Sequence, residues 1–227
     1  TVIALAQYGG RAFYSCKVAS AETGDFYYQD LQEQGVANNL GQGRGAGTTG
    51  KCLVMVTPDA DRTMNTFLGI TAHFSDKELV PAELIDSEYL YIEGYLAASP
   101  TGSAAAVKAR ELARKHGVKV AVTFSDMSMV TYFRESMQLM MGTSQGDRLD
   151  ILFCNKDEAL AFTGKGDVES AAHEMKKHAK SFAITLGAQG ALLFDGEREI
   201  DVLTSKVEAV DTNGAGDLFA GSFLYAL

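Results

Sequence analysis

Cysteine is scarce in this sequence, and its placement excludes a cysteine-based metal centre. The 227 residues contain only Cys16, Cys52 and Cys154. They are far apart and lack the close spacing of zinc ligands. Because each lies in an apolar run, we interpret all three as buried free thiols in a reducing cytosol. The sequence therefore favours a cytoplasmic protein.

Long apolar runs and a secretory leader are also missing. No stretch reaches the ~20 apolar residues that a bilayer-spanning helix needs, so we expect no membrane partner. The first residues, TVIALAQYGG, lack an initiator methionine and the charged-then-apolar order of a signal peptide. They read as the middle of a helix, and the last residues, Asp217 to Leu227, also stop within an apolar helical pattern. We expect the native protein to extend beyond both ends.

Positive charge is in deficit. Lysine and arginine number 20 against 29 aspartates and glutamates, which gives a formal net charge of −9. A nucleic-acid partner would favour a basic face, so the balance argues against one. An anionic ligand would need backbone amides, a metal ion or a few local cations.

Strand-like and helix-like segments alternate along most of the chain. The helix expected from Ser99 has a capping serine, a proline in its first turn and a stop at Gly117. Another helix is expected over about Thr23 to Gln34. Short, continuous apolar strands between helices predict an α/β fold with a doubly wound, mostly parallel sheet and helices on both faces. The expected strands are Ala12–Val18, Tyr89–Ile92, Val118–Phe124, Ile151–Phe153 and Phe182–Leu186.

The region from Val36 to Phe74 breaks this alternation. It is rich in glycine, threonine and asparagine, and it contains two strand-like runs, Cys52–Thr57 and Arg62–Leu68, with no helix between them. The residues that join these runs, Pro58 to Asp61, have turn chemistry. We therefore predict a small β-rich lid over residues 36–74, attached to an α/β nucleotide-binding and catalytic domain of residues 1–35 and 75–227.

A glycine-rich segment within this lid resembles two phosphate-binding motifs. Gly45–Gly50 fits G-x-G-x-x-G, and the extension to Cys52 nearly fits a P-loop. Both motifs need a helix directly after the glycines, because the helix N-terminus holds the phosphate. Here an apolar strand-like run follows, and Cys52 replaces the hydroxyl that binds Mg²⁺. We interpret the segment as a glycine-rich loop that enters the lid.

The segment DTNGAGD, Asp211 to Asp217, has the context that the first segment lacks. A β-prone run, Lys206–Val210, precedes it, and an apolar helical pattern follows it. Gly214, Ala215 and Gly216 allow the backbone to approach a ligand and offer amides at a helix start, which together form an anion hole. Asp217 lies in the first helical turn, where the helix dipole favours its ionised form. It can accept a proton from a substrate hydroxyl, although a simple helix-capping role is the alternative.

DTNGAGDLFAG resembles the C-terminal signature of the ribokinase or PfkB family of carbohydrate and nucleoside kinases. Asn155-Lys156-Asp157-Glu158 is similar to the family's N-x-x-E motif, and Thr185 to Gly190, TLGAQG, is similar to its T-L-G-x-x-G nucleotide loop. The pair Gly24-Asp25 also fits, and the resemblance covers essentially all 227 residues. PDADRTMNTFLG is similar to the lid of the branch that contains adenosine kinase-like and sugar kinases. The family's first strand and its G-G-x-x-x-N segment, which carry substrate-binding residues, have no counterpart here.

The resemblance implies a ribokinase-like fold and a set of site residues. Thr185, Gly187 and Gly190 would bind ATP together with Asn155 and Glu158. The last two share one helical face, and their side chains suit the outer sphere of hydrated Mg²⁺. Alone, the same pair is also a common helix-capping pattern, and TLG could be a tight turn.

The resemblance further implies that carbonyls near Asp211 and Asn213 could hold K⁺, as in some family members. Asp126 follows a predicted strand at the same edge of the sheet, either near Mg²⁺ or as a helix N-cap. Glu93, Gly94 and Tyr95 end another strand there and could border substrate. We interpret the five methionines between Met127 and Met141 as core packing.

The function predicted from this sequence is ATP-dependent phosphorylation of a hydroxymethyl group on a sugar or nucleoside. Asp217 is the expected base, and the Gly214–Asp217 turn is the expected anion hole. The expected partner is a small-molecule substrate, and an exposed lid edge would favour a homodimer. The alternative is a catalytically silent sugar- or nucleoside-binding protein on the same fold.

Overall fold

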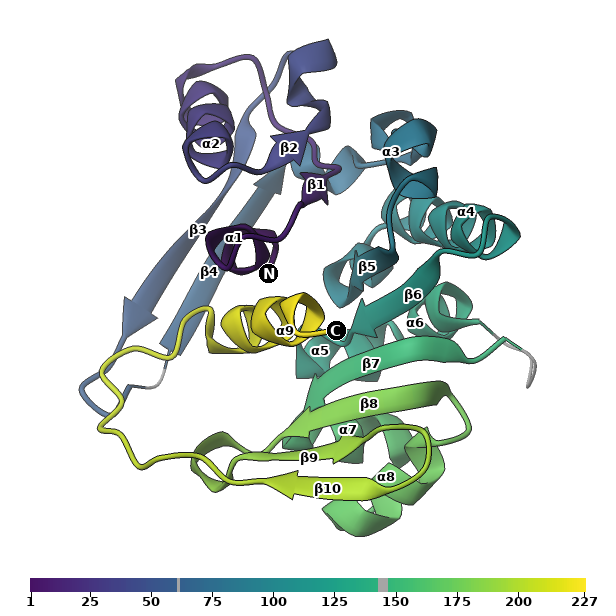
Figure 1. Ribbon diagram of the computed structural model, residues 1–227. Coiled ribbons are helices and arrows are strands. Elements are labelled where there is room, and N and C mark those ends of the chain that lie inside the picture. The colour runs from purple at the N-terminus through teal and green to yellow at the C-terminus, as the bar shows by residue number, and fades with distance from the viewer. Residues whose placement is uncertain (61, 143–146) are drawn as a thin grey trace. The chain divides into compact units, whose positions relative to one another are not determined.

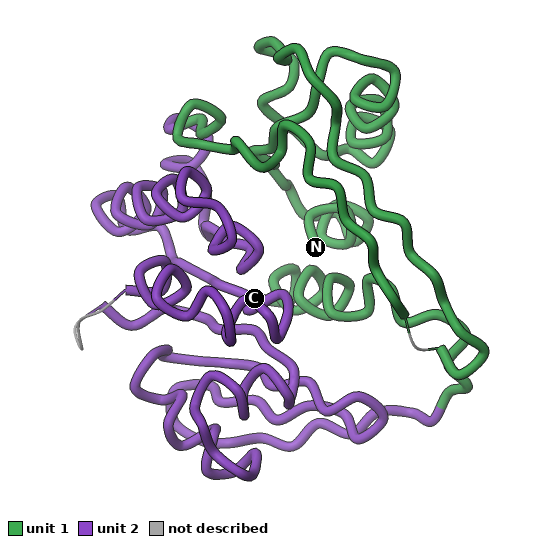
Figure 2. The backbone as a smooth tube through the Cα atoms, turned by 180° about the vertical axis from the view of Figure 1, so that it is seen from behind, with its two compact units in different colours: residues 1–80, 207–227 green, residues 81–206 purple. Residues whose placement is uncertain are grey.

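A computed structural model of the chain describes residues 1–60, 62–142 and 147–227. These residues form two compact units (Figure 2). We call Pro81–Lys206 the continuous unit, because it is one stretch of chain. We call Thr1–Val80 together with Val207–Leu227 the split unit.

Within the described residues, the continuous unit holds a six-stranded sheet in the order β10-β9-β8-β7-β6-β5 (Figure 1). Strands β5 to β8 pair in parallel, while β9 and β10 are antiparallel to their neighbours. The mostly parallel sheet of the predicted α/β class is therefore confirmed. The strands are β5 (Tyr89–Glu93), β6 (Lys119–Thr123), β7 (Leu149–Asn155), β8 (Ala179–Thr185), β9 (Ala191–Phe194) and β10 (Glu199–Val202).

Helices follow the parallel strands of this unit, and their ends match the capping signals in the sequence. The side chain of Ser99 accepts a hydrogen bond from the Gly102 amide at 3.2 Å, Pro100 opens α4, and Gly117 has a φ of 76° beyond its end. The predicted helix is thus confirmed nearly residue by residue. The helices are α3 (Pro81–Ile85), α4 (Pro100–Lys115), α5 (Met127–Tyr132), α6 (Arg134–Met141), α7 (Lys156–Thr163) and α8 (Val168–Met175), with 3₁₀ turns at Gly94–Ala98 and Gly187–Gln189.

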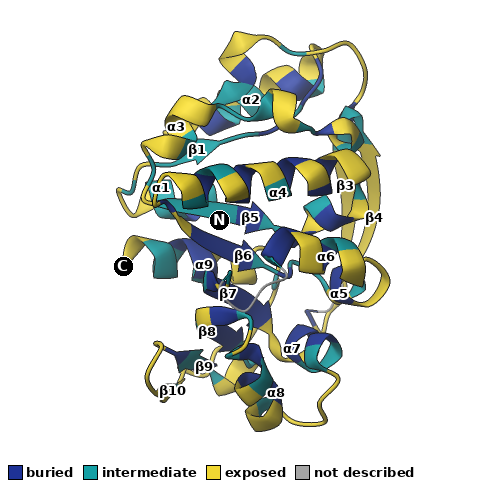
Figure 3. Cartoon of the chain, turned by 90° about the vertical axis from the view of Figure 1, so that its right-hand side faces the viewer, coloured by how far each residue is buried: buried dark blue, intermediate teal, exposed yellow. Residues whose placement is uncertain are grey.

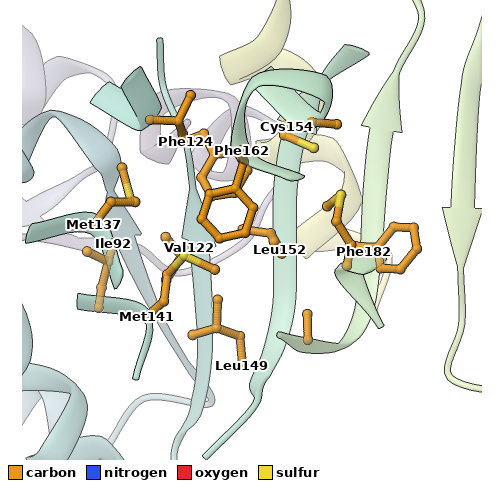
Figure 4. Close-up of a cluster of buried hydrophobic side chains, with 14 of the residues drawn as sticks. Ile92, Val122, Phe124, Met137, Met141, Leu149, Leu152, Cys154, Phe162 and Phe182 are labelled. Carbon is orange, nitrogen blue, oxygen red and sulfur yellow. The ribbon is translucent and has the colours of Figure 1, made fainter. Parts of the chain in front are cut away.

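The core of the continuous unit lies where β6 and β7 pack against these helices (Figure 4). Phe124 and Phe162 contact each other there, with ring centroids 4.7 Å apart. The interpretation of the methionine run as core packing holds for four of its five members. Met127 is the exception, because its side chain is half exposed in the first turn of α5. The buried four are Met129, Met137, Met140 and Met141.

The split unit contains short elements and one long hairpin. The predicted strand Ala12–Val18 shrinks to Phe13–Tyr14, because its parallel partner β2 offers only two residues for pairing. Helix α1 packs against α9 so closely that a Cβ on Gly221 would lie 2.6 Å from the Thr1 carbonyl oxygen. The elements are α1 (Val2–Gln7), β1 (Phe13–Tyr14), α2 (Glu22–Glu33), β2 (Ala37–Asn38), β3 (Thr49–Val56), β4 (Arg62–Gly69) and α9 (Ala215–Tyr225), with 3₁₀ turns at Asn39–Gln42, Ile70–His73 and Asp76–Glu78.

Strands β3 and β4 form the predicted antiparallel hairpin, and most of its residues are exposed (Figure 3). Leu53 and Phe67 are among the exposed apolar side chains. Cys52 is exposed as well, so the prediction that all three thiols are buried is wrong for this residue. A two-stranded ribbon buries neither face, and an apolar run is therefore no guarantee of burial. Asp61, which was expected in the connecting turn, lies outside the described residues.

None of the helices in the described part of the chain is long and apolar enough to cross a lipid bilayer.

Candidate active site

The DTNGAGD segment opens helix α9 in the split unit. Gly214 is the N-cap residue, with a φ of 74° in the left-handed region that glycine tolerates, and α9 begins at Ala215. The Ala215 amide donates to the Thr212 carbonyl at 3.2 Å. The amides of Gly216 and Asp217 belong to the first turn, which has no intrahelical acceptors to offer them. The predicted helix start is thus present, and these two amides are the ones that an anion could use.

The strand predicted just before this turn does not form. Residues from Leu203 to Asn213 contain no helix or strand, and Val207 and Val210 are almost fully exposed. β-branched residues favour a strand only where a neighbouring strand supplies hydrogen-bond partners and burial. Strand β10 ends at Val202, and no strand in the described part of the chain pairs with residues 206–210.

The signature turn contacts the tip of the hairpin within the same unit. Arg62, the first residue of β4, donates from Nη1 to the Thr212 hydroxyl at 2.9 Å, and the Thr212 hydroxyl lies 3.3 Å from the Ala60 carbonyl oxygen. Asp211 bends the turn by accepting from the Asn213 amide at 2.8 Å. Sequence reasoning missed Arg62, because nothing in the local pattern shows which distant loop an arginine will reach.

Asp217 presents a largely exposed carboxylate in the first turn of α9. Its Oδ1 accepts from the Thr1 hydroxyl at 2.7 Å and from the Thr1 backbone amino group at 2.9 Å. Partial burial raises the pKa of Asp217, but these two donors outweigh it, so the pKa lies below its ordinary value. The carboxylate is therefore ionised at neutral pH. The N-cap position belongs to Gly214, so the capping alternative for Asp217 has no support from this geometry.

Asn155 and Glu158 lie where β7 ends and α7 begins. They form a capping box: the Glu158 amide donates to Asn155 Oδ1 at 2.9 Å, and the Asn155 amide donates to Glu158 Oε2 at 2.8 Å. The capping role that the sequence allowed is therefore real. It does not exclude a further role, because the bonds occupy only one carboxylate oxygen.

Glu158 is unusual among capping residues because its side chain is buried, with 4% of the residue exposed. Burial raises the pKa of Glu158 to about 7, nearby Asp126 and Asp157 add to the rise, and the hydrogen bond from the Asn155 amide opposes it. A carboxylate whose charge is so unfavourable would be stabilised by a cation. Within the described residues, no group of three or more metal-ligating side chains is present. The carboxylate of Glu158 and the carboxamide of Asn155 are oxygen donors of the kind that suits hydrated Mg²⁺.

Thr185, Gly187 and Gly190 form the turn between β8 and β9. Gly187 and Gly190 have φ values of 58° and 99°, and a Cβ on Gly190 would lie 1.9 Å from the Val202 carbonyl oxygen. The turn thus requires glycine at these two positions. Thr185 pairs in register with Asn155 across β7 and β8. The structure therefore brings the N-x-x-E and T-L-G-x-x-G segments together at the carboxyl edge of the sheet, where open α/β folds bind ligands.

The glycine-rich Gly45–Gly50 segment is confirmed as a loop, over residues 45–48, that leads into a strand in its last two residues. Strand β3 begins at Thr49 and runs through Lys51 and Cys52. A P-loop requires a helix at this point, so the phosphate-binding interpretation of this segment is excluded.

This fold and these strand-end segments define the ribokinase-like class of α/β kinases. The chain belongs to the pfkB family of carbohydrate kinases, whose sequence pattern matches residues 1–227. The solved adenosine kinase from Sinorhizobium meliloti is 32% identical, with a TM-score of 0.92 over 99% of this chain and 68% of that chain.

Two curated relatives have different nucleosides in their names. A cytidine kinase from Thermococcus kodakarensis is 36% identical over 64% of this chain and 49% of its own length. An adenosine kinase from Schizophyllum commune is 30% identical over 87% of this chain and 64% of its own length. The chain thus spans about half to two thirds of the length of these relatives.

Proposed function

We propose that this chain is the nucleotide-binding and phosphoryl-transfer part of a kinase that moves the γ-phosphoryl group of ATP to a hydroxymethyl group of a sugar or nucleoside. The observation that carries the proposal is the DTNGAGD turn. It combines a left-handed Gly214, a helix start and an Asp217 carboxylate in the first turn of that helix. A family of sugar and nucleoside kinases is the setting in which this combination has a use.

Each group of residues has a proposed task. Asp217 orients the acceptor hydroxyl and takes its proton, for which a weak base is sufficient in a loose transition state. The Gly214-Ala215-Gly216 turn directs first-turn amides at the charge that develops on the transferred group. Asn155 and Glu158 hold the water shell of Mg²⁺, and the ion itself neutralises phosphate charge when it is bound. Thr185, Gly187 and Gly190 border the nucleotide.

Further parts of the proposal concern the surroundings of the site. Residues 36–74 act as the lid over the acceptor, attached to a catalytic domain of residues 1–35 and 75–227. The exposed apolar hairpin suits a homodimer through the lid. Carbonyls near Asp211 and Asn213 hold K⁺. The protein acts in the cytoplasm on a small molecule and has no nucleic-acid partner.

A substrate panel tests the proposal. The purified full-length protein is incubated with ATP, Mg²⁺ and one acceptor at a time, and ADP release is followed. The acceptors are ribose, fructose, adenosine, inosine, guanosine and cytidine. We expect one of them to stimulate ADP release at least tenfold over the rate without acceptor. Binding of an acceptor without ADP release would instead favour the silent binding protein, which has no need for an ionised Asp217.

A further inference from the structure

Ser125 connects the ends of strands β5 and β6 through a strained backbone. Its φ is 65°, which a residue with a side chain rarely adopts. The next amide, from Asp126, donates to the Phe124 carbonyl at 2.8 Å. A bond between residues two apart, together with a positive φ at the residue between them, is the pattern of the rare and strained form of the γ-turn. Such strain persists only where the surroundings hold it, and it is frequent at functional sites.

The surroundings that hold Ser125 are specific. Its hydroxyl accepts from the Gly94 amide at 2.8 Å and donates to Glu93 Oε2 at 2.9 Å. A Cβ on Gly94 would lie 2.3 Å from the Phe124 carbonyl oxygen, so the two strand ends touch backbone to backbone. The Ser125 amide donates to the Thr123 hydroxyl at 3.2 Å. One side chain thus fixes the distance between two strand ends at the edge that carries the candidate site.

Asp126 connects this strained turn to the Asn155–Glu158 pair. Asp126 follows Ser125 directly and caps α5, accepting from the Ser128 amide at 2.8 Å. Strand β6 is the parallel neighbour of β7, and α5 packs against α7. Both helices therefore begin at the same edge, with Asp126 at one start and Glu158 in the first turn of the other. The effect of the Asp126 charge on Glu158 agrees with this placement.

We propose that Ser125 is a positioning residue, whose strained turn and two hydroxyl bonds hold Asp126 where its charge supports the binding of Mg²⁺–ATP beside Asn155 and Glu158. The inference rests on the proposed function for the identity of the nucleotide and for the placement of Mg²⁺ at Asn155 and Glu158. Ser125 itself touches no reacting atom in this proposal. A role in folding alone would predict instead that loss of the hydroxyl lowers stability and leaves Mg²⁺ dependence unchanged.

The test measures ATP binding to the full-length protein by isothermal titration calorimetry over a series of Mg²⁺ concentrations. Ser125→Ala removes the hydroxyl and keeps the backbone strain. Ser125→Gly removes both the hydroxyl and the strain, because glycine adopts a positive φ readily, and this variant should therefore fold. We expect both variants to need roughly tenfold more Mg²⁺ for half-maximal ATP affinity, a size typical of residues behind a metal site. Ser181→Ala is the control, because it removes a comparable hydrogen bond, from the Ser181 hydroxyl on β8 to the Asp150 carbonyl on β7 at 2.7 Å.

The route through Asp126 is tested with the double variant. If Ser125 acts through Asp126, then Ser125→Ala combined with Asp126→Asn will need no more Mg²⁺ than the more affected single variant. Additive shifts would overturn this route. A Mg²⁺ requirement in both Ser125 variants within threefold of the wild type would overturn the proposal as a whole. Since calorimetry needs no acceptor, a protein that binds ATP but transfers nothing would contradict the proposed function and leave this inference standing.

Discussion

Asn155 and Glu158 cap one helix end reciprocally, each through its side chain and its amide, at 2.9 and 2.8 Å. The same two residues are the proposed holders of the Mg²⁺ water shell. The capping box fixes the Glu158 side chain in one orientation before any ion arrives. The capping box and the proposed role in holding Mg²⁺ are thus compatible. Variants that keep the capping hydrogen bonds but remove the negative charge can separate the two roles.

Asp217→Asn is expected to remove most turnover and to leave the fold intact. The amide keeps the size of the side chain but cannot accept the acceptor's proton, which typically costs about 10²–10⁴ in rate. Stability should change by no more than ~1 kcal/mol, since the side chain is exposed and Gly214 holds the cap position. The measurements are kcat and a thermal melt. Asp167→Asn, at the N-cap of α8, is the matched control.

A kcat for Asp217→Asn within threefold of wild type, which is ~0.7 kcal/mol in barrier, would show that Asp217 is not the base.

Glu158→Gln is expected to weaken the use of Mg²⁺ without disturbing the acceptor. Glutamine can still accept from the Asn155 amide, so the capping box survives. It lacks the negative charge that orients the water shell, and kcat should fall roughly 10- to 100-fold. The KM for the acceptor should stay near its wild-type value, because the ion contacts phosphates. If Glu158→Gln has the kcat of the wild type at every Mg²⁺ concentration, then Glu158 has a capping role only.

Glu158 should also make stability depend on pH in the direction opposite to most carboxylates. Its pKa in the folded protein is about 7, above its ordinary value of 4.5. Between these values the folded protein binds more protons than the unfolded chain, so the contribution of Glu158 to the free energy of unfolding falls as pH rises from 4.5 to about 7. The fall should be about 1–3 kcal/mol. It is measured as wild type minus Glu158→Gln in urea titrations, and a difference that rises with pH would contradict it.

Replacement of Na⁺ by K⁺ is expected to raise kcat. Asp211 and Asn213 are already joined by a hydrogen bond of 2.8 Å, and a cation on nearby carbonyls would favour the turn that directs its amides at phosphate. Initial rates are compared in KCl, NaCl and choline chloride at equal ionic strength. Equal rates in all three salts would exclude a specific monovalent cation.

The sequence predicted those parts of the fold that depend on local chemistry. Ser99, Pro100 and Gly117 mark the ends of α4, because capping and φ preferences act within a few residues. The exposure of Cys52 and the missing strand at Lys206–Val210 could not be predicted in the same way, since both depend on whether another element covers or pairs with the segment.

In the candidate site, too, the sequence predicted the features that depend on local chemistry and not those that depend on distant residues. Glycine and carboxylate motifs located Asn155, Glu158, Thr185 and Asp217. The contact between Arg62 and Thr212 joins residues distant in sequence, and no local pattern indicates it. The strain at Ser125 is hidden for a related reason: serine gives no sign of a positive φ, and the contacts of Ser125 with Glu93 and Gly94 join residues 32 and 31 positions apart in sequence.

The division of the chain into a continuous and a split unit has a consequence for how the protein is made. Pro81–Lys206 leaves the ribosome as one stretch, and its parallel strands can pair as soon as Thr185 has emerged. The split unit is different, because α1 precedes the continuous unit in the chain, whereas α9, its packing partner, follows it. Helix α1 and the exposed hairpin therefore lack the helix that carries Asp217 until the whole continuous unit has been synthesised. A nascent chain that stalls before Val207 would contain every strand of the six-stranded sheet but would lack α9, the packing partner of α1.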